Sequence, residues 1–149
     1  MTTPMKDRMK HMHLSWMADN CDHELAEGSR LNRSAEEVLG RLIAGEAEAR
    51  AARAVERRLK AAKLPGVKTL DQFDWTWPSE INRDHVRHVF TMSFMRTATN
   101  VVFIGGVGIG KTHLAAALAR EACLRNRSVL FTQAVHIIND LAEAQRHGA

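Results

Sequence analysis

The clearest chemistry in this 149-residue sequence lies in the stretch GGVGIGKT, residues 105–112. A glycine followed by four residues and then Gly-Lys-Thr is the spacing of a phosphate-binding loop. Glycines allow backbone turns that residues with side chains avoid, so that successive N–H groups converge on the phosphates of a nucleotide. The spacing therefore predicts a nucleotide-binding site.

Each part of this loop has an expected role. Lys111 is expected to reach the β- and γ-phosphates, and the hydroxyl of Thr112 is expected to bind Mg²⁺. The N-terminus of the following helix adds its partial positive charge behind the anion. His113 is predicted to pack or cap near the helix start, and we assign no catalytic residue. The residues expected to bind the nucleotide are Gly105, Gly106, Val107, Gly108, Ile109, Gly110, Lys111, Thr112 and His113.

A strand before the loop and a helix after it must hold such a site in place. The residues at 100–104 are NVVFI, which is typical of a buried strand, and those at 111–126 are KTHLAAALAREACLRN, which indicates an amphipathic helix. SVLFT at 128–132 predicts a further strand, followed by a helical pattern to the C-terminus. We therefore predict the α/β fold class, with an incomplete P-loop core. The alternative is a glycine-rich turn that joins strand to helix and holds no ligand.

The first half of the chain is predicted to be helical. No proline occurs from Met5 to Lys63, and Ala, Leu, Met, Glu and Arg dominate this stretch. Ser34 followed by Glu37 predicts a capping box at the start of a helix of roughly 29 residues. The Pro-Gly pair at 65–66 ends that helix.

Aromatic residues crowd the segment that follows the long helix. Phe73, Trp75 and Trp77 lie between two prolines, and we expect them to anchor a linker on the neighbouring domain. A second helix is predicted at about 83–95. The predicted organisation is a helical N-terminal domain (1–64), an aromatic linker (65–82) and the N-terminal part of a P-loop domain (83–149).

Basic residues recur along the second half of the long helix. Arg50, Arg53, Arg57 and Lys60 are spaced to fall on one helical face. Such a stripe neutralises about four phosphates of a DNA backbone without reading bases. The alternative is a solvated surface whose charges are balanced by glutamates of the same helix, as in the pair Glu46–Arg50.

Composition and charge limit the remaining possibilities. The net charge is +4 and the pI is about 9.5, a mild basic excess that permits a polyanionic partner. The N-terminus lacks the apolar core of a signal peptide, and no stretch approaches the ~18 apolar residues of a membrane span. We therefore expect a cytoplasmic protein without membrane association. Cys21 and Cys123 fit no zinc or disulfide spacing and are predicted to be buried or free thiols.

Three stretches together resemble the IstB family, the ATP-binding helper proteins of bacterial insertion-sequence transposition. They are AEEVLGRLIAGEAEARAARAVERRLKAAK at 35–63, LKAAKLPGVKTLDQFDW at 59–75 and FIGGVGIGKTHLAAALAREACLRNRSVLFT at 103–132. The IstB family is similar in turn to the DnaC helicase loaders, and both are AAA+ ATPases. The resemblance covers the chain from about Leu31 to its end. It implies ATP and Mg²⁺ as cofactors, DNA and a transposase as partners, and assembly into a homo-oligomer.

The sequence also departs from the family pattern. The acidic Walker-B residue, the residue that positions water and the arginine finger have no counterpart after SVLFT. Asp140 and Glu143 lie within a helical pattern and are not accepted as substitutes. We therefore expect a C-terminally truncated fragment that binds ATP and does not hydrolyse it efficiently.

Three other functions remain open from the sequence. A DnaC-like helicase loader would share the loop and the basic helix. A P-loop phosphotransferase would need an acceptor site, for which no residue gives a sign. A non-enzymatic fragment would bind DNA or a partner through its helices while its nucleotide site is vestigial.

Overall fold

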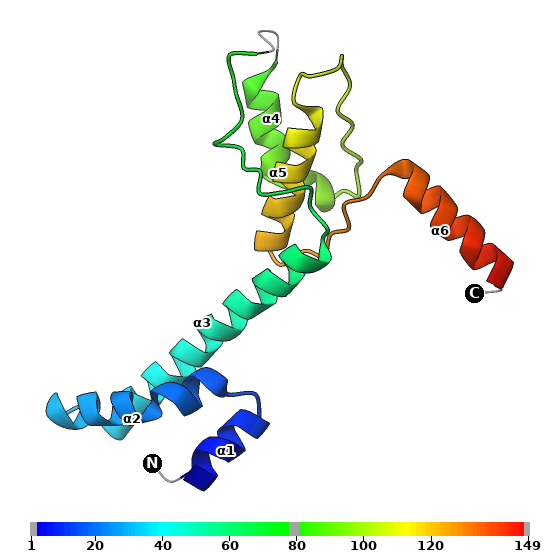
Figure 1. The fold of residues 1–149 in the computed structure, drawn as a ribbon. Coiled ribbons are helices and arrows are strands. Elements are labelled where there is room, and N and C mark those ends of the chain that lie inside the picture. Colours follow the sequence, from blue (N-terminus) through cyan, green and yellow to red (C-terminus); the bar gives the residue numbers. More distant parts are fainter. Residues whose placement is uncertain (1–2, 78–80, 148–149) are drawn as a thin grey trace. The chain divides into compact units, whose positions relative to one another are not determined.

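A computed structural model of the chain describes residues 3–77 and 81–147 (Figure 1). Its helices are α1 (Thr3–His11), α2 (Ser15–Arg30), α3 (Ala35–Ala61), α4 (Arg83–Phe90), the short 3₁₀ helix η1 (Ser93–Met95), α5 (Lys111–Leu124) and α6 (Ala134–His147). The chain divides into two units, 1–54 and 55–149. Among the described helices, none combines the length and the apolar character that a membrane span requires.

The predicted α/β fold class is wrong, because residues 3–77 and 81–147 contain helices and no strand. The segments 100–104 and 128–132, predicted as strands, lack regular secondary structure. A strand is stable only when its N–H and C=O groups pair with a neighbouring strand. Neither segment has such a neighbour among the described residues, and Val102 and Ile104 expose 73% and 89% of their surface. Their β-branched residues favour an extended backbone, but no partner strand in the described ranges supplies the hydrogen bonds of a sheet.

The first unit is a small helical core. α1 packs against α2, and Met17 and Cys21 of α2 meet Val38 and Leu42 of α3. The Cys21 side chain is fully buried and is a free thiol, as predicted. This cluster joins the hydrophobic faces of α2 and α3, which the sequence pattern alone does not pair.

The start of α3 confirms the predicted capping box. The Ser34 amide donates to the Glu37 carboxylate over 2.7 Å, and the Glu37 amide donates to the Ser34 hydroxyl over 3.2 Å. Two free amides of the first turn are thereby satisfied. The helix ends at Ala61, close to the predicted end.

Glu46 fixes α2 to α3 through a buried carboxylate. Its side chain is 4% exposed, accepts from the Met17 amide over 3.1 Å, and pairs with Arg53 over 2.8 Å. Met17 lies in the first turn of α2, whose preceding residue Leu14 offers no side-chain cap. Burial raises the pKa of Glu46, but the bonds from the Met17 amide, Arg53 and the Trp16 amide outweigh it and lower the pKa below 4.5. Glu46 thus caps a helix other than its own.

The second unit is organised around Phe73. This ring is 6% exposed and packs with Val86 and Phe90 of α4 and with Leu114 and Ala117 of α5. The predicted aromatic anchoring therefore holds for Phe73, whereas Trp77 is 65% exposed. Cys123, near the end of α5, is fully buried, and burial raises the pKa of its thiol.

Close packing around Gly45 predicts opposite effects for two glycine substitutions on α3. A Cβ at Gly45 would lie 2.1 Å from the Trp16 ring, whereas a Cβ at Gly40 would meet nothing within 4 Å. Gly45→Ala is expected to lower the free energy of unfolding by about 1–3 kcal/mol through overpacking. Gly40→Ala is expected to raise it by up to about 1 kcal/mol through helix propensity. Urea unfolding of the full chain followed by circular dichroism measures both, and equal effects would contradict this packing.

The first unit is expected to lose stability in acid through Glu46. Its folded pKa lies below the ordinary 4.5, so its contribution is complete above about pH 4.5 and is lost as the pH falls through the folded value. Glu46→Gln is expected to cost about 1.5–3 kcal/mol at neutral pH, the range for hydrogen bonds to charged groups. Glu48→Gln removes an exposed carboxylate of the same helix and serves as the control. Urea unfolding over the acid range tests this, and an unchanged acid limb in Glu46→Gln would refute it.

Candidate functional site

The loop from Gly105 to Gly110 turns the chain into α5. Gly110 precedes the first residue of α5 with φ 85° and ψ 13°, and Gly108 has φ 82°. Both values lie in the left-handed region, where a side chain adds strain and glycine does not. A Cβ at Gly110 would also lie 2.6 Å from the Phe73 ring. The glycines at these two positions therefore form the tight turn that the sequence predicts there.

Eight consecutive amides, in the loop and the first turn of α5, have no partner within the described parts of the chain. The N–H groups of residues 106–113 donate to no backbone or side-chain oxygen there, and Leu114 is the first to bond back, to the Gly110 carbonyl over 3.0 Å. Unpaired amides at a helix N-terminus attract anions, because the helix dipole adds to their partial positive charge. Val107, at the loop tip, is fully exposed.

Lys111 folds back over the loop. Its ammonium group donates to the Gly105 carbonyl over 2.9 Å and to the Gly106 carbonyl. These two carbonyls thus accept the ammonium hydrogen bonds that a phosphate would otherwise accept. The next residue, Thr112, is exposed, and its hydroxyl makes no hydrogen bond within the described ranges.

His113 attaches the aromatic linker to the start of α5. Its Nε2 lies 2.8 Å from the Thr69 carbonyl, and its ring meets the Phe73 ring edge-on with centroids 5.5 Å apart. The predicted packing role near the helix start is therefore the one observed. Because a Cβ at Gly110 would lie only 2.6 Å from the Phe73 ring, the linker also packs against the end of the loop.

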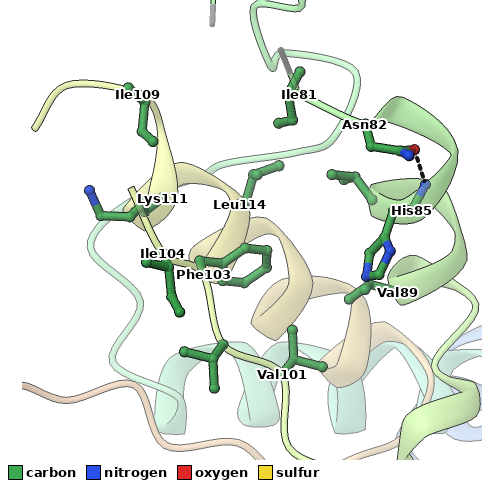
Figure 2. Close-up of a pocket in the computed structure, with 12 residues that line it drawn as sticks. Ile81, Asn82, His85, Val89, Val101, Phe103, Ile104, Ile109, Lys111 and Leu114 are labelled. Atoms are coloured by element: carbon green, nitrogen blue, oxygen red, sulfur yellow. Dashed lines mark hydrogen bonds between the residues drawn. The ribbon is translucent and has the colours of Figure 1, made fainter. Parts of the chain in front are cut away.

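A cavity of about 420 Å³ lies beside the loop (Figure 2). Figure 2 shows the side chains of Phe103 and Leu114 between Lys111 on one side and α4 on the other. The part of the lining that the described residues form is mainly apolar and includes no aspartate or glutamate. The volume and the apolar walls are typical of small-molecule sites.

Comparison with known proteins identifies the family. A profile described as "IstB-like ATP binding protein" matches residues 7–149. The chain is 34% identical over 148 residues to an ATP-binding protein of insertion sequence IS5376 from Geobacillus stearothermophilus, covering 97% of this chain and 59% of the relative. It is 36% identical over 139 residues to an ATP-binding protein of insertion sequence IS21 from Pseudomonas aeruginosa, covering 93% and 51%. This chain belongs to the IstB-like ATP binding protein family.

The IstB-like chain spans only part of these relatives. It covers between half and three fifths of their length, and a Mycobacterium tuberculosis relative that is 29% identical gives 55%. The family resemblance drawn from the loop, the linker and the long helix is thus confirmed.

The four basic residues predicted to bind DNA differ in their surroundings in the IstB-like chain. Arg53 is held by Glu46, and Arg50 donates to the His13 carbonyl over 3.3 Å. Arg57 and Lys60 are exposed and have no ion-pair or hydrogen-bond partner in the described ranges. The expected pair Glu46–Arg50 does not form, because the Glu46 carboxylate turns to Arg53 and to α2. DNA contact through these residues stays a prediction.

Sequence reasoning missed the wall of the cavity opposite the loop. Ile81, Asn82 and His85 line it, and the Asn82 side chain accepts from the His85 amide over 2.8 Å (Figure 2). Asn82 is the N-cap of α4. An asparagine directly before an amphipathic run is a helix-start signal. This signal could have indicated the start of α4, which carries this wall.

Phe73 is expected to contribute strongly to the stability of the second unit, which contains the loop. Phe73→Ala should lower the free energy of unfolding of the second unit by about 3–5 kcal/mol, because a buried ring is replaced by a cavity. Trp77→Ala removes a larger aromatic that is mostly exposed, and it should cost less than about 1 kcal/mol. Urea unfolding of the full chain, followed by tryptophan fluorescence and circular dichroism, compares the two. Similar losses would show that Phe73 has no special role.

Proposed function

We propose that this chain binds ATP and serves as an ATP-binding helper of insertion-sequence transposition. The triphosphate would lie on residues 105–113, with Lys111 at the β- and γ-phosphates. The relatives are named as ATP-binding proteins of insertion sequences, which supports the assignment. The proposal concerns this span of the family, because the relatives are longer.

The observation that carries the proposal is the row of unpartnered amides at residues 106–113. A cluster of free N–H groups at a helix N-terminus fits a polyphosphate, and the apolar cavity next to Lys111 offers space for a base and sugar. Lys111 would have to exchange its bonds to the Gly105 and Gly106 carbonyls for bonds to phosphate oxygens. The exchange replaces neutral acceptors with charged ones, which form stronger hydrogen bonds.

For Mg²⁺, the residues fit in part. Thr112 offers one exposed hydroxyl, and no cluster of three His, Cys, Asp or Glu residues in the described ranges could hold a metal ion. Mg²⁺ commonly keeps several waters and takes its other ligands from nucleotide phosphates. We therefore propose that the ion arrives with ATP, and that this span binds ATP without hydrolysing it efficiently.

We further propose that the helper acts on DNA together with a transposase and further copies of itself. Arg57 and Lys60 are the predicted DNA-binding residues whose charges remain free, whereas Arg50 and Arg53 would first have to leave His13 and Glu46. Contacts of this kind hold the phosphate backbone and read no base. A cytoplasmic location is part of the same proposal.

Lys111→Ala is expected to weaken ATP binding at least about tenfold, because a charge-assisted contact to phosphate is lost. Lys68→Ala is the matched control, since Lys68 is an exposed lysine of the same unit and does not line the cavity beside the loop. Titration of a fluorescent ATP analogue against the full chain, with Mg²⁺ present, measures both variants. Equal affinity of wild type and Lys111→Ala would remove the nucleotide site from residues 105–113.

A further inference from the structure

A positively charged hollow lies in the second unit, at the end of α3. This basic cavity measures about 390 Å³ and is lined by Leu59, Lys60, Lys63, Leu64, Gly66, Val67 and Arg120. Two of the cations come from the end of α3 and the turn after it, and Arg120 comes from α5. Among the described residues that line it, none is acidic.

The backbone after α3 shapes this cavity. Lys63 has φ 53° and Gly66 has φ 137°, so the chain turns sharply twice within four residues. The Ala62 carbonyl accepts from the Phe131 amide over 2.8 Å, which ties the turn to another segment of the same unit. The position of Lys63 is therefore fixed by main-chain geometry.

The three cations of the basic cavity form no ion pair in the part of the chain that the structure describes. Lys60, Lys63 and Arg120 make no ion pair and no side-chain hydrogen bond within residues 3–77 and 81–147. The nearest acid along α5, Glu121, is already paired with Arg125 over 2.8 Å. Three positive charges around one hollow repel each other, and an anion seated among them relieves that repulsion.

We propose that the basic cavity seats a phosphodiester group of a nucleic-acid backbone. Lysine and arginine are the usual donors to backbone phosphates, and such contacts carry no sequence information. Leu59, Leu64 and Val67 form an apolar wall that suits the carbon face of a sugar next to the phosphate. The cavity extends the row of cations from Arg57 and Lys60 to Lys63 and Arg120. Spacing along α3 does not predict that Arg120, on α5, joins this row.

This inference deepens the proposed association with DNA and rests on it, but it is independent of the ATP loop. The test uses a fluorescein-labelled duplex oligonucleotide and the full chain, with anisotropy recorded between about 50 and 200 mM salt. The variant is the double substitution Lys63→Gln and Arg120→Gln. The control is the double substitution Arg96→Gln and Arg127→Gln, which removes the same charge from exposed residues outside the cavity. Circular dichroism verifies that both variants fold.

The cavity variant is expected to raise the Kd roughly tenfold and to reduce the salt slope by about one unit, whereas the control changes both by less. The charge-conserving variant Lys63→Arg and Arg120→Lys should keep binding close to wild type, which separates charge from shape. Equal losses in the cavity and control variants would overturn the proposal while leaving DNA association intact.

Two further outcomes would also overturn it. If wild type fails to bind the duplex at either salt concentration, both the cavity proposal and the proposed DNA association fail. Titration with inorganic phosphate at matched ionic strength tests the other source of this chemistry. If the cavity variant loses phosphate binding but binds the duplex as wild type does, the cavity holds a free anion and no backbone.

Discussion

The second unit depends on one buried ring, Phe73. It fills the space between α4 and α5, meets His113 edge-on, and lies against the backbone of Gly110. With the ring in this position, residue 110 must be a glycine, since any Cβ there would overlap the ring. The linker therefore belongs to the candidate site as much as the loop does, because it packs against Gly110 and bonds to His113 in the first turn of α5.

The two units differ in how their backbone amides are hydrogen-bonded. In the first unit a buried carboxylate, Glu46, satisfies amides of a neighbouring helix and an arginine at once. In the second unit the amides at the start of α5 have no partner in the described ranges, and Lys111 donates to loop carbonyls. The first arrangement stabilises helix packing, whereas the second keeps donors available for an external anion. The unpaired donors of the candidate site therefore belong to the second unit.

Sequence alone predicted features that depend on neighbours a few residues apart. The Ser34–Glu37 cap, the stop after α3 and the turn at Gly108 and Gly110 are all local, and the structure has them. The prediction of strands at 100–104 and 128–132 is wrong, because a strand needs a partner that its own residues cannot specify. The Glu46–Arg53 pairing was missed for a similar reason: the carboxylate orients toward α2, and only the tertiary fold brings α2 there. The wall formed by Ile81 and His85 likewise depends on how α4 packs.

The cysteines described above divide evenly between the units, and both are fully shielded from solvent. A thiol reacts with alkylating reagents only as an accessible thiolate, so neither side chain is modified until its surroundings open. The rates at which Cys21 and Cys123 become labelled would then report the opening of each helical core separately. The chain thus contains a natural pair of reporters for whether a ligand tightens one half of the molecule and leaves the other unchanged.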